Sequence, residues 1–276
     1  MEKREFGQVL NEVRVKNPLV QCLTNFVTMN DCANILLAAG ASPAMAHHPE
    51  EAGEFAGFSS AVVLNMGTAD NTEGMLAAGK GANQAGVPVV FDPVACGATT
   101  LRRSIAAQVL KEVKLAVIRG NASEIFALAQ STNGGKGVDA SAEDLVRKDK
   151  LEPALSAAKA LSKETGAVVV ISGPVDLIVE NEKAAIISNG SETMPRITGC
   201  GCMLTALIGG FCGATSDYFV ASVAGTAAMG IAGDIAQEKM DHNGTGTGTF
   251  RVDLIDAISQ LTGEDVNERA DYETIS

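Results

Sequence analysis

The chain has 276 residues, of which 46% are hydrophobic and 20% are charged, so its composition is near the globular average and argues against disorder. A net charge of −12, from 33 acidic and 21 basic residues with no basic block, excludes a general nucleic-acid binder because backbone phosphates would be repelled. A small anionic ligand stays possible, because backbone amides, one arginine or a metal ion can override the global field locally.

Six irregularly spaced cysteines, in a chain large enough to bury a core, predict no disulfide framework and indicate a reducing, cytoplasmic compartment. The charged first ten residues lack the pattern of a signal peptide. The most apolar region, 203–236, is expected to break at Asp217 into two apolar pieces, each shorter than the roughly 18 residues that suggest a membrane span, and we expect buried helices there. We therefore expect a soluble protein without a membrane partner.

Short β-branched runs alternate with longer alanine-rich stretches up to residue 173. The runs predict strands at 20–24, 61–65, 87–92, 115–119 and 167–172. The stretches predict helices at 28–39, 72–85, 99–113, 122–130 and 144–165. Runs such as VPVVFD and VVVIS are apolar throughout, which is typical of strands covered on both faces. The pattern predicts an α/β fold, with a largely parallel central sheet between two layers of helices.

The pattern changes after residue 173. Runs at 176–180 and 183–189 flank Asn181-Glu182 and predict a hairpin, and helices are predicted at 201–213, 217–238 and 250–262. The polar stretch 131–149 is predicted to be a mobile surface loop, and the polar tail after Gly263 is predicted to fray. No shift in composition marks a boundary, so we expect one domain over residues 1–276.

The strongest local signal is Thr198-Gly199-Cys200-Gly201-Cys202, which directly precedes an apolar helical run. Glycine lets the backbone turn tightly, and the free amides at a helix start favour an anion such as a phosphate. The residues alone also fit an ordinary glycine-rich turn with two buried thiols.

Paired acids are predicted at the carboxyl edge of the sheet. Asp92 ends one apolar strand, and Glu124 follows a strand that ends at Arg119. Ligands bind at this edge in open parallel sheets, and two carboxylates there could hold Mg²⁺ while an arginine orients phosphate oxygens. The same residues could instead be a turn cap, a solvated acid and a surface ion pair.

Two other motifs are ambiguous. The repeat GTGTGT at 244–249 invites a nucleotide-binding interpretation, but Thr249 could equally cap the final helix. The adjacent His47 and His48 do not share a helix or strand face and have no third ligand nearby in the sequence. We expect both histidines on the surface of the loop before Pro49.

The turn at 198–202 resembles the GAGD anion hole of the ribokinase superfamily, with Cys202 where most members have Asp. A Cys there, after TGxG, is the mark of the hydroxyethylthiazole kinase family. The similarity continues through residues 20–48, NMGT at 65–68, FDPVACGAT at 91–99, IRGNASE at 118–124 and GGKGVD at 134–139. On these motifs the chain is identified as a member of that family.

The resemblance implies a ribokinase-like three-layer α/β/α sandwich without a separate lid domain, assembled as a homotrimer with substrate sites between subunits. It implies Mg²⁺- and ATP-dependent phosphorylation of the hydroxyl of 4-methyl-5-(2-hydroxyethyl)thiazole, a step of thiamine biosynthesis and salvage. The implied catalytic turn comprises Gly199, Cys200, Gly201 and Cys202. The implied binding residues are Met45, Gly199, Asn25 and Gly67 for the thiazole, Arg119, Ser172 and Asn121 for ATP, and Asp92 and Glu124 for the metal.

Three other functions stay open at this level. The nearest is a superfamily kinase acting on a pyrimidine or pyridine alcohol, against which Met45 and Cys202 favour the thiazole because a soft thioether suits a sulfur heterocycle. The second is a non-catalytic protein that senses ATP or a vitamin precursor, and the acid pair argues against it. The third is a disulfide-exchange enzyme built on Cys200 and Cys202.

Overall fold

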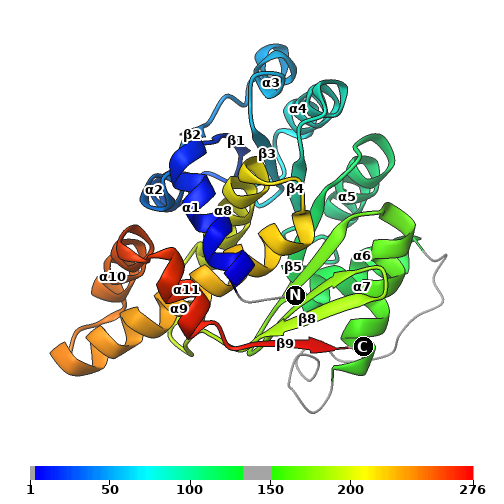
Figure 1. The fold of residues 1–276 in the computed structure, drawn as a ribbon. Helices are drawn as coiled ribbons and strands as arrows, with labels where there is room; N and C mark the ends of the chain where they lie inside the picture. Colours follow the sequence, from blue (N-terminus) through cyan, green and yellow to red (C-terminus); the bar gives the residue numbers. More distant parts are fainter. Residues whose placement is uncertain (1–3, 133–150, 276) are drawn as a thin grey trace.

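The computed structural model describes residues 4–132 and 151–275 (Figure 1). Three features predicted from the sequence fall outside the described residues. They are residues 133–149 of the predicted loop, the motif at 134–139 and the predicted start of the helix at 144. The described strands form one sheet in the order β2-β1-β3-β4-β5-β6-β7-β8-β9. Their bounds are β1 Leu19–Leu23, β2 Ser42–Ala44, β3 Ala61–Asn65, β4 Val89–Asp92, β5 Val117–Asn121, β6 Val168–Ser172, β7 Asp176–Glu180, β8 Lys183–Ile187 and β9 Tyr272–Ile275.

The first six strands are parallel, and β7, β8 and β9 extend the sheet in antiparallel pairing. The strands are apolar throughout because successive side chains enter different cores. Val62 packs into one hydrophobic cluster and Val63 into the other, and Val169 and Val170 divide in the same way. The predicted hairpin is confirmed as the β7–β8 pair.

Helices cover both faces of the sheet (Figure 1). One layer contains α1 Arg4–Lys16, α2 Met29–Ala39, α8 Cys200–Ala214, α9 Tyr218–Asn243, α10 Thr247–Gln260 and α11 Gly263–Arg269. The other contains α3 Pro49–Ala56, α4 Thr72–Ala85, α5 Thr100–Glu112, α6 Ala122–Thr132 and α7 Glu152–Thr165. A short 3₁₀ helix, η2, spans Met194–Arg196. The predicted three-layer α/β/α sandwich is confirmed, and every described strand belongs to its one sheet.

The first of two wrong expectations about the second half of the chain concerns the length of its most apolar helix. The apolar region does break at Asp217, whose carboxylate accepts the Val220 N–H at 2.9 Å and caps α9. The helix predicted over 217–238 is confirmed as α9, but it runs for 26 residues, which is longer than the membrane-span length that the sequence was expected to avoid. By length and composition it could cross a membrane, yet 83% of its most apolar window is buried inside the fold. Its length follows from packing against α8, α10 and the sheet.

The C-terminal tail is ordered rather than frayed. A capping box at Thr262 and Asp265 starts α11. Strand β9 then pairs with β8 (Figure 1), and the register places Tyr272 opposite Ile187. Pairing covers the otherwise open edge of β8, which the polar composition of the tail does not reveal. The helices α1 and α3 and the short strand β2 are further elements that the sequence pattern did not predict.

Parallel strands bring their carboxyl ends to one edge of the sheet. Here β3 ends at Asn65, β4 at Asp92, β5 at Asn121 and β6 at Ser172, and the turn after β1 carries Asn25. Helix α8 begins over this edge and packs against β1, β3 and β4. The candidate site lies between these strand ends and the start of α8.

Candidate active site

The glycine-rich turn starts helix α8. Gly199 is its N-cap residue with φ of 83°, a left-handed conformation that favours glycine, and an added Cβ would lie 2.7 Å from Thr28 Cγ2. The helix begins at Cys200, so the N–H groups of Cys200, Gly201 and Cys202 belong to its first turn, where no helical carbonyl pairs with them. The turn therefore presents donors and the positive end of a helix dipole toward the sheet edge.

Arg119 lies between this turn and the sheet. Its Nη2 donates to Ser172 Oγ, its Nη1 is 3.6 Å from Asp92 Oδ2, and a Cβ added to Gly201 would be 2.5 Å from that same Nη1. The guanidinium is buried, and its Nε has no partner within the described part of the chain. Gly201 is thus the residue that lets a buried cation lie against the start of α8.

Asp92 is a buried acid with one oxygen engaged and one free. Its Oδ2 accepts hydrogen bonds from Asn65 Nδ2 at 3.0 Å and Thr205 Oγ1 at 2.7 Å, whereas Oδ1 has no partner among residues 4–132 and 151–275. Burial raises the pKa of Asp92 to about 6, opposed by the Arg119 charge and reinforced by Glu124. Asp92 is therefore not a turn cap, and its free oxygen suits a cation.

Glu124 is also buried rather than solvated. Ala95 N–H donates to its Oε1 and Asn121 N–H to its Oε2, both at 2.8 Å. Asn121 in turn accepts the Glu124 N–H on Oδ1 at 3.0 Å, so the NASE segment folds onto itself at the start of α6. The described residues contain no cluster of three or more His, Cys, Asp or Glu that could hold a metal. Two carboxylates with one free oxygen instead fit an ion that takes most of its ligands from phosphate and water, as Mg²⁺ does.

Cys202 lies at the centre of an amide network. Asn25 Nδ2 and Asn65 Nδ2 each donate to its Sγ at 3.3 Å. Burial and the Asp92 charge raise the pKa of the Cys202 thiol, while bonds from Thr28, Asn25 and Asn65 oppose the shift. The thiol is therefore neutral at pH 7, which speaks against a disulfide-exchange enzyme, because such enzymes need a thiolate.

The neighbouring Cys200 is similarly unreactive. Burial raises the pKa of its thiol to about 12, although the charge of Arg119 lowers it. All six cysteines lie in the described residues and none forms a disulfide, as expected. The pair in the turn therefore contributes backbone amides and a neutral thiol, not redox chemistry.

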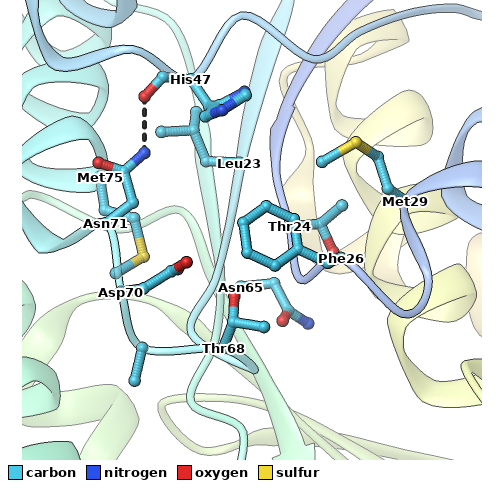
Figure 2. A pocket seen from close by; sticks show the side chains of 11 residues that line it. Leu23, Thr24, Phe26, Met29, His47, Asn65, Thr68, Asp70, Asn71 and Met75 are labelled. Atoms are coloured by element: carbon cyan, nitrogen blue, oxygen red, sulfur yellow. Dashed lines mark hydrogen bonds between the residues drawn. The ribbon is translucent and has the colours of Figure 1, made fainter.

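A small pocket adjoins this network on the side of β3 (Figure 2). Its lining residues are Leu23, Thr24, Phe26, Met29, His47, Asn65, Thr68, Ala69, Asp70, Asn71 and Met75. In Figure 2 the Asn71, Asp70 and Met75 side chains lie on one side and Met29 on the other, with the Phe26 ring between them. Asn65 belongs to both the pocket and the Cys202 network, so the two are continuous.

The expected thiazole residues lie at different distances from this network. Gly67 N–H donates to Asn65 Oδ1 at 2.9 Å, and a Cβ on Gly67 would be 2.7 Å from Asn25 Cβ. Met45 is partly buried against the core, and its carbonyl oxygen is 2.8 Å from Nδ1 of His47, which lines the pocket. Asn25 and Gly67 are therefore part of the cluster, whereas Met45 reaches it only through the pocket wall.

Residues 10–264 match the sequence model of the hydroxyethylthiazole kinase family. The chain belongs to this family. The hydroxyethylthiazole kinase of Clostridium beijerinckii is 48% identical over 94% of this chain and 93% of that protein, and the one of Ruminiclostridium cellulolyticum is 44% identical over 97% and 96%. The solved structure of the hydroxyethylthiazole kinase protein from Pyrococcus horikoshii, at 32% identity, matches with a TM-score of 0.85 over 98% of this chain and 99% of that one. The fold is ribokinase-like, as the resemblance implied.

Several polar residues of this kinase-family site were not predicted from the sequence. Asn65 carries the same signal as Asp92, a polar residue ending an apolar strand, and could have been found by it. Thr205 lies inside the apolar helix α8, where no pattern distinguishes it. Arg102, from α5, donates to the carbonyls of Met66, Gly67 and Val94 and thereby fixes the loops after β3 and β4. Only tertiary structure brings such residues to the edge.

The histidine pair and the glycine–threonine repeat, which were ambiguous in the sequence, have different outcomes. His47 and His48 are exposed as expected, and His48 caps α3 by accepting the Glu50 N–H. Thr249 does not cap the last long helix, because α10 begins at Thr247 with Gly246 as its N-cap residue. The helix starts earlier than the composition suggests, so the end of the glycine–threonine repeat is helical rather than a loop.

Proposed function

We propose that this protein transfers the terminal phosphoryl group of ATP to the primary hydroxyl of 4-methyl-5-(2-hydroxyethyl)thiazole, giving the thiazole monophosphate and ADP in thiamine biosynthesis and salvage. The family match over residues 10–264 carries the proposal. It is supported by the convergence of helix-start amides, one buried arginine and two buried acids at one sheet edge. Phosphoryl transfer depends mainly on alignment and on stabilising negative charge, which these groups supply.

The phosphate side of the site is assigned to the turn and to β5 and β6. The N–H groups of Gly199, Cys200, Gly201 and Cys202 would stabilise charge on the transferring group. Arg119 and Ser172 are proposed to contact ATP, and their mutual hydrogen bond supports a shared role. Asn121 is proposed as a third contact, with Nδ2 available because Oδ1 holds the start of α6.

A divalent cation is proposed to bind beside these phosphates, with Mg²⁺ as the specific ion. Asp92 would hold it through its free Oδ1, and Glu124 would hold it directly or through water, because both of its oxygens already accept backbone N–H groups. When bound, such an ion would supply positive charge that offsets the negative charge of the phosphates. The positive groups and the ion at this site would thus offset the net negative charge of the chain where ATP binds.

The acceptor side is assigned to Asn25, Gly67, Met45 and Gly199, which are proposed to hold the thiazole with its hydroxyl near Cys202. A neutral thiol cannot take up a second proton, so the hydroxyl proton would pass to a phosphate oxygen or to solvent as the new P–O bond forms, and the site relies on positioning. The chain is further proposed to act as one domain, as a homotrimer with sites between subunits, and in the cytoplasm.

A coupled assay of ADP release tests the proposal. The purified protein is mixed with ATP and the thiazole alcohol, once with MgCl₂ and once after treatment of protein and nucleotide with EDTA. We expect metal-dependent ADP formation and a phosphorylated thiazole by mass spectrometry. A panel of pyrimidine and pyridine alcohols is run in parallel. A preference for one of these alcohols would identify it as the substrate in place of the thiazole. Tight binding of the thiazole without ADP from any alcohol would instead indicate a sensor.

A further inference from the structure

We propose that Asn65 is a positioning residue that locks the Cys202 side chain to Asp92 and so fixes the acceptor side of the site relative to the metal side. This inference rests on the proposed function. Asn65 ends β3, is 5% exposed, and lies between the two groups. Its Nδ2 donates to Asp92 Oδ2 at 3.0 Å and to Cys202 Sγ at 3.3 Å.

Two backbone N–H groups determine which way the amides point. Gly67 N–H donates to Asn65 Oδ1 at 2.9 Å, and Thr28 N–H donates to Asn25 Oδ1 at 3.1 Å. Because a backbone N–H can only donate, each amide must present its oxygen there and its Nδ2 elsewhere. Asn25 then donates to Asn65 Oδ1 at 3.1 Å as well as to Cys202 Sγ. The orientation of the network therefore comes from the main chain.

This orientation has a chemical consequence for Cys202. Its sulfur accepts two N–H groups, so the thiol proton must point away from both amides, and negative charge on the sulfur meets two donors. The two hydrogens of Asn65 Nδ2 are divided between Asp92 and Cys202, so neither side chain can move without breaking a bond to the same nitrogen. Asn25 bonds to the thiol and to Asn65 but not to Asp92, which makes Asn65 the link between the halves.

A double-mutant cycle tests this link. Asn65→Ala should lower kcat by roughly 10- to 100-fold with both KM values changed less than about 3-fold, because binding groups remain while alignment is lost. In a Cys202→Ala background the same substitution should cost kcat clearly less than in the wild type, because only the bond to Asp92 then remains to be lost. An equal loss in both backgrounds would overturn the proposal.

A second variant guards against a simple loss of folding. Asn65→Asp keeps the size and the oxygen that accepts the Gly67 N–H, but it cannot donate two hydrogens. It should lower kcat at least as much as Asn65→Ala. The control is Asn83→Ala, which removes an amide that bridges Lys114 N and O at 2.7 and 2.9 Å, joining the end of α4 to the segment before β5. That variant should retain wild-type kcat.

A measurement without substrates separates this inference from the proposed function. The rate at which iodoacetamide alkylates Cys202 is followed by peptide mass spectrometry in the wild type and in Asn65→Ala. Loss of a donor to the sulfur should slow alkylation, because the reactive thiolate loses a hydrogen bond. A faster rate would show that Asn65 only covers the thiol, an unchanged rate would show that it does not act on the thiol, and either result would overturn the proposal. If the wild type phosphorylates no thiazole alcohol, the function fails but this comparison still stands.

Discussion

Gly201→Ala should impair catalysis while leaving the fold intact. The added Cβ would lie 2.5 Å from Arg119 Nη1, 3.0 Å from Nη2 and 3.1 Å from Cζ. Non-bonded heavy atoms pack best at roughly 3.5 Å or more, so the guanidinium must retreat by about 1 Å. That retreat strains its bond to Ser172 and changes its distance from Asp92.

The magnitude follows from what Arg119 is proposed to do. A displacement of about 1 Å in a phosphate-orienting group can cost on the order of 100-fold in rate, and we expect a loss of roughly 10- to 100-fold in kcat/KM for ATP. The helix start itself is unharmed, because alanine is favoured over glycine in helices by up to about 1 kcal/mol and the Gly201 N–H is retained. Thermal unfolding should therefore stay close to that of the wild type.

The assay is steady-state ADP release at varied ATP and saturating thiazole alcohol, paired with thermal unfolding. Gly210→Ala, on the same helix α8, is the matched control, since its added Cβ would meet the end of the Leu36 side chain at 3.1 Å and Ala41 Cβ at 3.6 Å, and no residue of the site. It should retain kcat/KM within about 2-fold. Full activity of Gly201→Ala would refute the reasoning, because it would mean that the position of Arg119 against the turn does not matter.

Three further predictions concern the same edge. Gly199→Ala should destabilise the fold by roughly 1–2 kcal/mol, measured by urea unfolding, because φ is 83° and Thr28 Cγ2 is 2.7 Å away. Cys202→Asp should retain or raise kcat, because a carboxylate is a better base, and a loss above about 100-fold in a folded protein would contradict that role. Asp92→Asn should abolish activity. Burial raises the pKa of Asp92 to about 6, so between about pH 4 and pH 6 the metal-free folded state binds more protons than the unfolded chain. The unfolding free energy of the wild type, measured relative to that of Asp92→Asn, should therefore fall as the pH rises through that window.

The sequence predicted the parts of the fold that depend on local pattern. Apolar runs bounded by polar residues located the strands that end at Asn65, Asp92 and Ser172, because a strand buried on both faces is a continuous run of apolar residues in the sequence. The order of strands and helices then implied which ends share an edge. The prediction that the C-terminal tail would fray was wrong because α11 and β9 are stabilised by contacts with α1 and β8, not by their own composition.

The site shows the same division. From sequence alone, Gly199–Cys202 could be placed at a helix start, Asp92 at the end of a strand and Glu124 shortly after one, because glycine conformation and strand ends are local properties. Only the tertiary structure decided that Arg119 lies against Gly201, that Asn65 joins Cys202 to Asp92, and that burial raises the pKa of the Cys202 thiol. Those outcomes depend on burial and on distances between segments far apart in the chain, and neither quantity is encoded in any one segment.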